Sequence, residues 1–232
     1  MTERATELAA NLAQLRARIA AACAAAGRDP DAVALLPVTK YFPASDVEIL
    51  YELGCREFAE SREQEAAPKI AAVGHSDIRW HFIGRLQRNK AKAVAKWAAE
   101  IHSVDSERLV RTLADPARAV PVDVLVQVGL DTDPGRGGIA PQELSALADA
   151  VAEAPGLVLR GLMAVPPRDV DPAVAFAQLA QLHADLRRAH PAATKLSAGM
   201  SGDLEQAVQF GSTCVRVGTA LLGARPIISQ QH

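Results

Sequence analysis

Short apolar segments alternate with longer helix-like segments along the whole chain, and this alternation constrains the fold more than any other feature. Eight of the apolar segments have the length and composition of β-strands, at intervals of about 20–40 residues. The expected strands cover residues 32–39, 56–60, 79–84, 100–104, 122–130, 157–165, 195–198 and 213–217. Regular alternation with short connections predicts parallel strands joined by helices.

Eight such units predict an α/β protein built as a single (β/α)8 TIM barrel. Residues 2–25 are rich in alanine and carry an apolar stripe, which predicts an extra N-terminal helix that ends before Gly27 and packs on the barrel. An open doubly wound sheet is the alternative, but no GxGxxG motif opens any expected helix. We therefore expect one domain over residues 1–232, with residues 1–26 as the added helix.

The composition points away from nucleic acid and membranes as partners. The chain has 25 basic and 27 acidic residues, and aromatic residues make up only 4% of it. No apolar run approaches the length of a membrane span. Three scattered cysteines, Cys23, Cys55 and Cys214, favour a reducing compartment, so we expect a cytoplasmic protein.

The first strand ends in a lysine, within the segment ALLPVTK of residues 34–40. In a parallel barrel, groups at the carboxyl ends of strands face the functional end. Partial burial there would lower the pKa of Lys40 and leave more neutral amine to attack a carbonyl group. The alternative is a lysine whose ammonium group simply reaches solvent.

Two small turns follow the last two expected strands. In the segment SAGMSGDLEQAV, Ser201 stands where a helix begins, and its hydroxyl either caps that helix or binds an anion. In VRVGTALLG, Gly218 and Thr219 let the backbone approach a ligand closely. Because TIM barrels commonly hold phosphate after their last strands, the two turns together predict a phosphate pocket.

Two further strand residues are candidate ligands. Arg216 alternates with two valines, so inside the barrel it would be a buried cation that needs a cofactor ring nitrogen or a barrel carboxylate as partner. His81 is expected either to face the mouth of the barrel or to be a hydrogen-bonded core histidine. We predict no metal site, because His75, His183 and His190 have no partners at metal-ligand spacing.

A strand-end lysine beside a phosphate pocket is what pyridoxal 5'-phosphate (PLP) requires. The segments VTK, EFAES, WHFIGRLQRNK, LRGLMAVPP, LSAGMSGDLEQAV and GSTCVRVGTALLGAR, in this order over residues 33–225, resemble the PLP homeostasis proteins. That family is also described as proline synthetase co-transcribed homologues and is related to the N-terminal barrel domain of alanine racemase. The resemblance implies a barrel of the alanine racemase type that binds PLP as a monomer or weakly associating protein.

The resemblance also implies roles for individual residues. Lys40 matches the lysine that forms the Schiff base, and Arg216 matches the arginine that faces the pyridine nitrogen and keeps it unprotonated. The remaining expected cofactor-binding residues are Ser201, Gly218 and Thr219 at the phosphate, Met200 beside them, and Ser61, His81 and Met163 at other strand ends.

The chain departs from the family pattern at two places. Ser61 replaces an asparagine that is usual after the glutamate of the second strand. Any role of the asparagine amide would then fall to the hydroxyl group of Ser61. The loop of residues 131–139 is unusually rich in glycine, with Arg136 as an anion-facing candidate.

The expected function is that of a non-catalytic PLP carrier that limits free PLP, supplies apoenzymes and maintains vitamin B6 and amino-acid pools. An amino-acid racemase is the first alternative, but it needs a second base opposite the lysine. Only Tyr41 and Tyr51 are available, and Tyr41 should point away from Lys40 on an extended strand. The second alternative is an aldolase that uses Lys40 without a cofactor, with Glu60 as its base.

Overall fold

The computed structural model describes residues 2–130 and 137–224. Its strands are β1 (Ala34–Pro37), β2 (Glu57–Glu60), β3 (Arg79–Phe82), β4 (Glu100–Val104), β5 (Val122–Gln127), β6 (Leu157–Met163), β7 (Lys195–Ser197) and β8 (Cys214–Val217). Its α-helices are α1 (Glu3–Ala25), α2 (Ala44–Glu52), α3 (Glu63–Val73), α4 (Arg88–Val94), α5 (Glu107–Leu113), α6 (Leu144–Glu153), α7 (Pro172–Ala189), α8 (Leu204–Gln209) and α9 (Thr219–Leu222). Short 3-10 turns, η1 (Pro30–Ala32) and η2 (Pro141–Glu143), precede β1 and α6.

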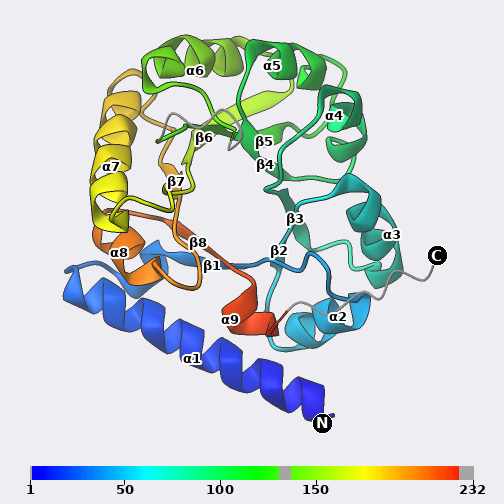
Figure 1. The fold of residues 1–232 in the computed structure, drawn as a ribbon. Coiled ribbons are helices and arrows are strands. Elements are labelled where there is room, and N and C mark those ends of the chain that lie inside the picture. Colours follow the sequence, from blue (N-terminus) through cyan, green and yellow to red (C-terminus); the bar gives the residue numbers. More distant parts are fainter. Residues whose placement is uncertain (1, 131–136, 225–232) are drawn as a thin grey trace.

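All eight strands are parallel and pair in the order β1-β8-β7-β6-β5-β4-β3-β2. Strands β1 and β2 meet through a single bridge between Val38 and Ala59, where the Thr39 N–H also donates to the carbonyl oxygen of Ala59 at 3.0 Å. The strands form a nearly closed ring with helices around it (Figure 1). The predicted (β/α)8 TIM barrel is confirmed.

Side chains alternate between the inside of the barrel and the layer of helices. Val215 and Val217 of β8 pack outward against the apolar stripe of α1, within one of two large apolar clusters between sheet and helices. Inside the barrel, Leu36, Val38 and Ala59 form only a small apolar cluster. The remaining interior holds buried polar side chains from four strands, namely His81, Glu100, His102, Ser197 and Arg216.

Helix α1 crosses the outside of the barrel beside α8, α9 and α2 (Figure 1). Its predicted apolar stripe is confirmed, with exposed fractions of 0–4% at Leu8, Leu12, Leu15 and Ile19. The helix ends where predicted, because Gly27 follows it with a φ of 65°. Asn11 of α1 also donates to the carbonyl oxygen of Leu221 in α9 at 2.9 Å, so the first helix is tied to the last.

Seven of the eight expected strands were one to four residues too long. The first strand ends at Pro37 rather than at residue 39, because the chain turns after the single bridge at Val38. The helix expected to begin at Ser201 begins at Leu204 behind Asp203, so Ser201 is not its cap.

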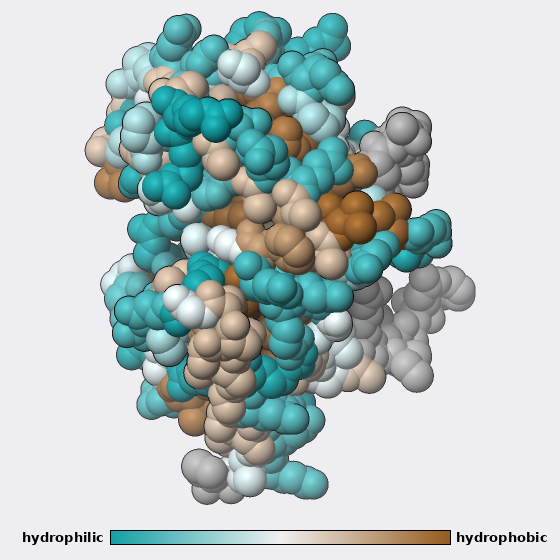
Figure 2. Space-filling view, turned by 90° about the vertical axis from the view of Figure 1, so that its left-hand side faces the viewer, coloured by the Kyte–Doolittle hydropathy of each residue, from teal (hydrophilic) through white to brown (hydrophobic). Residues whose placement is uncertain are grey.

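In the described part of the chain, no helix has both the length and the apolar composition to cross a bilayer. The side of the molecule that carries α7 and α8 is predominantly hydrophilic, with hydrophobic residues gathered in limited areas between polar ones (Figure 2). Val170 and Val174, at the start of α7, are 40% and 62% exposed.

Candidate functional site

A hollow of about 270 Å³ opens at the carboxyl ends of β1 and β8. It brings together six of the predicted site residues, namely Lys40, Met200, Ser201, Arg216, Gly218 and Thr219. Tyr41, considered above only as a second base, also lines it, together with four residues that the sequence did not single out, namely Val38, Phe42, Ile83 and Gly202. Strand periodicity points to two of these, because Val38 and Ile83 stand two positions after the inward-facing Leu36 and His81.

Lys40 and Tyr41 line the same hollow, so the expectation that Tyr41 points away from Lys40 was wrong. The expectation assumed an extended backbone, but Tyr41 has a φ of 69°, a left-handed conformation that costs a residue with a Cβ about 1–2 kcal/mol. The Lys40 Nζ lies 6.0 Å from the centroid of the Tyr41 ring. The guanidinium carbon of Arg62 lies 5.0 Å from the same centroid.

A buried ion pair holds the backbone just before Lys40. From α3, the Lys69 Nζ donates to the carbonyl oxygen of Thr39 at 2.8 Å and to the Glu60 Oε1 at 2.6 Å. The Thr39 hydroxyl donates to the same carboxylate oxygen at 2.7 Å. Burial raises the pKa of Glu60, and the charge of Lys69 opposes this shift. Glu60 does not line the hollow, and its Oε1 accepts from Thr39 and from Lys69, so it joins α3 to the turn that precedes Lys40.

The two glycine-containing turns form a cradle at the other side of the hollow. The Ser201 hydroxyl accepts from the Ala220 N–H at 3.2 Å, which links the turn after β7 to the turn after β8. The backbone N–H groups of Ser201, Gly202, Gly218 and Thr219 have no hydrogen-bond partner among the described residues. Several unpaired backbone N–H groups that converge on one concavity are typical of an anion site.

Helix α1 supports this cradle from outside. Its Arg18 Nη2 donates to the carbonyl oxygen of Ser201 at 3.2 Å, and its Nε pairs with the Glu205 Oε1 at 2.8 Å. The cradle is therefore held by the first and the last parts of the described chain.

Arg216 points inside the barrel and is only 4% exposed. Its Nη1 donates to the Ser197 Oγ at 2.6 Å and its Nη2 donates to the carbonyl oxygen of Ala164 at 3.0 Å. Burial lowers the pKa of this guanidinium from its high ordinary value. Neither bond goes to a carboxylate, so Arg216 lines the hollow as a buried cation that forms no ion pair within the described residues.

Three predicted site residues lie outside this hollow. Ser61 lines a separate hollow of about 280 Å³ with Arg62 and Arg85. His81 lies inside the barrel at 2% exposure and bonds to His102, and burial lowers its pKa to about 3. Met163 is 2% exposed at the end of β6. Their contact with a cofactor stays a prediction, and the candidate Arg136 lies outside the described residues.

The sequence missed a cluster of potential metal ligands, because its members come from two strands that meet only in the barrel. Donor atoms of His81, Glu100 and His102 lie within 4.8 Å of one another, and all three residues are buried. The predicted absence of a metal site stays a prediction.

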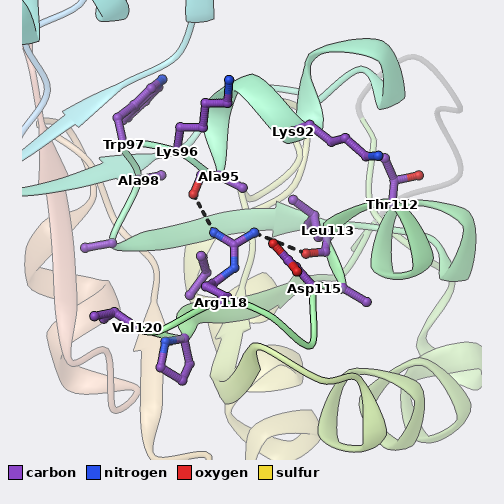
Figure 3. A pocket seen from close by; sticks show the side chains of 14 residues that line it. Lys92, Ala95, Lys96, Trp97, Ala98, Thr112, Leu113, Asp115, Arg118 and Val120 are labelled. Carbon is purple, nitrogen blue, oxygen red and sulfur yellow. Dashed lines mark hydrogen bonds between the residues drawn. The ribbon is translucent and has the colours of Figure 1, made fainter.

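A larger hollow, of about 670 Å³, lies at the opposite end of the barrel (Figure 3). Its central side chain is Arg118, which donates to the carbonyl oxygens of Ala95 at 2.6 Å and Leu113 at 3.4 Å. These carbonyls belong to the last turns of α4 and α5, where helix dipoles are negative. Arg118 already supplies the cation that these negative helix ends favour, so the hollow at the carboxyl ends of β1 and β8 is the better candidate site.

The alanine racemase N-terminal domain family matches residues 10–226 of the chain. The PLP homeostasis protein of Mycobacterium tuberculosis is 49% identical over 248 residues, covering 98% of this chain and 96% of that protein. The protein of the same name from Escherichia coli is 41% identical, covering 94% of this chain and 97% of that protein.

Solved structures agree with these matches. PipY of Synechococcus elongatus, in a structure with PLP bound, has a TM-score of 0.79 and 34% identity, covering 93% of this chain and all of that one. Alanine racemase of Corynebacterium glutamicum, with a TM-score of 0.69 and 17% identity, shares the fold. Because the family match and both relatives extend over nearly the whole chain, this protein belongs to the alanine racemase N-terminal domain family and, within it, to the PLP homeostasis proteins.

Proposed function

We propose that this protein binds PLP between Lys40 and the cradle and acts as a non-catalytic carrier that regulates intracellular PLP, vitamin B6 and amino-acid pools. The observation that carries the proposal is the convergence of a lysine, unpaired turn N–H groups and a buried guanidinium on one hollow of about 270 Å³. The names of the relatives and the PLP bound to PipY support it.

The residues of the hollow fit the three parts of PLP. A Cβ added at Gly202 would meet no atom within 4 Å, and one at Gly218 would come no closer than 3.5 Å to the Val38 carbonyl oxygen. Neither glycine is therefore required by the packing of the protein alone, and both leave room at the cradle for a phosphate group. Lys40 supplies an amine for the aldehyde, and Arg216 supplies a cation for the ring.

Arg216 favours storage over catalysis. Bound PLP supplies an aldehyde that reacts reversibly with a primary amine and a ring that withdraws electrons. A guanidinium group has only donors and stays protonated, so beside the ring nitrogen it favours the unprotonated form. An unprotonated ring withdraws fewer electrons, which suits retention and release of PLP better than carbanion chemistry.

Racemisation is the second candidate function, because Tyr41 lines the hollow and could supply a base there. Racemisation by two bases needs one base on each face of the substrate. Lys40 and Tyr41 are consecutive residues of one turn, with the Nζ of Lys40 6.0 Å from the ring centroid of Tyr41. They therefore approach the hollow from the same wall, and for this reason we propose the carrier. The aldolase alternative lacks its base, because the hydrogen bonds of Glu60 go to Thr39 and Lys69.

The experiment is a titration of the purified protein with PLP, followed by borohydride reduction and peptide mass spectrometry. We expect a visible absorption band, one equivalent of reduced cofactor on Lys40, and transfer of unreduced PLP to an added apoenzyme. Racemisation of L-alanine should not exceed that of free PLP. Turnover well above that level would make the protein a racemase, and failure to take up PLP would remove the carrier proposal.

Gly218 gives a separate test of the cradle. Its φ of −107° is open to alanine, so Gly218→Ala is expected to keep or raise the free energy of unfolding by at most about 1 kcal/mol. The added methyl group would project toward Val38, which lines the hollow, and should weaken PLP binding several-fold. Thermal unfolding without PLP and a PLP titration measure the two effects. Equal PLP affinity in both proteins would contradict the placement of the phosphate at this turn.

A further inference from the structure

A chain of buried polar side chains runs through the barrel interior from the hollow toward the amino ends of the strands. It starts at Arg216, which lines the hollow, and continues through Ser197 and His102 to Glu100. These four side chains come from β8, β7 and β4 and are 0–4% exposed. The chain ends at Lys195, whose ammonium group pairs with the Glu100 Oε2 and is partly exposed.

The distances along the chain are those of hydrogen bonds. The Arg216 Nη1 lies 2.6 Å from the Ser197 Oγ, and this hydroxyl oxygen lies 2.9 Å from the His102 Nδ1. The His102 Nε2 lies 3.1 Å from the Glu100 Oε1. The same Nε2 lies 3.0 Å from the His81 Nδ1, while the other ring nitrogen of His81 is 3.6 Å from the Glu57 Oε2.

The charges of the two ends fix the direction of every bond. Arg216 can only donate, so the Ser197 oxygen accepts from it. Glu100 pairs through its Oε2 with the ammonium group of Lys195, so its carboxylate is ionised. The ionised Glu100 can only accept, so the neutral imidazole of His102 donates to it from Nε2, which lies 3.1 Å from the Glu100 Oε1. Its Nδ1 is then an acceptor, and the Ser197 hydroxyl donates to it.

The opposite tautomer of His102 fits poorly. It would place a lone pair of Nε2 against a carboxylate oxygen 3.1 Å away, and it would leave the Ser197 hydroxyl hydrogen without the Nδ1 acceptor. In the assigned direction the four side chains form one continuous series of donors and acceptors. Polar networks that are fully satisfied in this way hold their members in one arrangement.

We propose that Ser197, His102 and Glu100 are positioning residues for Arg216, and that their one-directional hydrogen bonds hold its guanidinium at the wall of the cofactor hollow. The inference deepens the proposed function, on which it rests, because it concerns the group that would face the ring of PLP. It also means that the ion pair between Lys195 and Glu100, at the amino end of the barrel, influences PLP binding at the carboxyl end.

The first test uses the protein without PLP. Nitrogen-15 NMR of the imidazole groups at neutral pH distinguishes the two tautomers of His102. We expect the proton on Nε2 in the wild-type protein. A proton on Nδ1, or a doubly protonated His102, would overturn the assignment. Equimolar binding of zinc that shifts the His102 Nε2 signal would also overturn the assignment, because the metal would then take the place of the proton.

The second test compares two buried serines in the PLP-loaded protein. Ser197→Ala removes the link between Arg216 and His102, and we expect PLP to be released about tenfold faster, as for the loss of a hydrogen bond to a charged group. The pH midpoint of the visible band should also shift, and Ser197→Thr should restore both properties. Ser212→Ala is the matched control, because Ser212 is equally buried but donates only to strand carbonyls.

The outcomes separate the two proposals. Equal release rates and equal pH midpoints for Ser197→Ala and Ser212→Ala would show that the buried polar side chains merely fill the barrel. PLP binding by the wild-type protein would still stand. If the wild-type protein bound no PLP, the proposed function would fail, and the NMR measurement would still test the direction of the chain. Should Ser197→Ala fail to fold, Glu100→Gln replaces it. Asp123→Asn is then the control, because Asp123 pairs with Arg160 at 2.8 Å and does not belong to the series from Arg216 to Glu100.

Discussion

Lys40→Ala is expected to lose all covalent attachment of PLP and to bind PLP at least tenfold more weakly than the wild-type protein, a difference of at least about 1.4 kcal/mol. The reason is that Lys40 is the one lysine that lines the hollow with the cradle and Arg216 among the described residues. The remaining contacts to the phosphate and ring should still allow reversible binding. Borohydride reduction with mass spectrometry measures the attachment, and equilibrium dialysis measures the affinity.

Lys92→Ala is the matched control for this experiment. Free PLP reacts with exposed lysines at random, and Lys92 is an exposed lysine of α4, away from the hollow. Its replacement should leave the stoichiometry of labelling and the affinity unchanged. Equimolar labelling that persists in Lys40→Ala would contradict the assignment of Lys40 and direct attention to another lysine.

Lys69→Met should destabilise the protein strongly, by about 3–5 kcal/mol at neutral pH, because it leaves a buried carboxylate without its counter-ion. Glu60 is fully buried and the Lys69 side chain is only 9% exposed. Chemical denaturation followed by circular dichroism measures the loss. A much smaller loss would show that water or movement of the turn stabilises the carboxylate.

The same variant has a predictable dependence on pH. Burial already raises the pKa of Glu60, and removal of Lys69 takes away the charge and hydrogen bond that oppose this shift. A carboxyl group whose pKa is higher in the folded protein than in the unfolded chain stabilises the fold below its unfolded pKa, and this contribution is lost as the pH rises through the folded pKa. The deficit of Lys69→Met should therefore shrink as the pH falls from neutral toward 5.

Two further variants check the explanation. Lys69→Met combined with Glu60→Gln should recover most of the lost stability, because a neutral amide can still accept from Thr39. Lys90→Met is the matched control, since its pair with Glu63 spans 3.4 Å and the lysine side chain is 36% exposed. Loss of this half-exposed pair should cost no more than about 1 kcal/mol.

Periodicity predicted the elements well where local sequence decides the structure. Strand β4 (Glu100–Val104) has the predicted bounds, and the alternation of Arg216 with two valines left two directions for its side chain, of which the structure shows the buried one inside the barrel. The pattern of apolar residues marks such a strand, and that requires no knowledge of the partner element.

Contacts between distant segments were not predictable in this way. The direction of Tyr41 depends on a turn that Lys69 holds from α3, and no local pattern marks a left-handed tyrosine. The bond between His102 and Ser197 joins residues 95 positions apart, so it follows only from the closed barrel. The sequence predicted six of the residues that line the hollow, but not the hydrogen bonds that hold them in place.

The contact between α1 and the last turns has a consequence for biosynthesis. Asn11 bonds to Leu221 and Arg4 bonds to Leu222, across separations of 210 and 218 residues. These contacts can form only after β8 and α9 have left the ribosome. Until then, the apolar stripe of α1 lacks these packing partners. A nascent chain therefore cannot complete the cradle, or hold an anion there, before α9 has been synthesised.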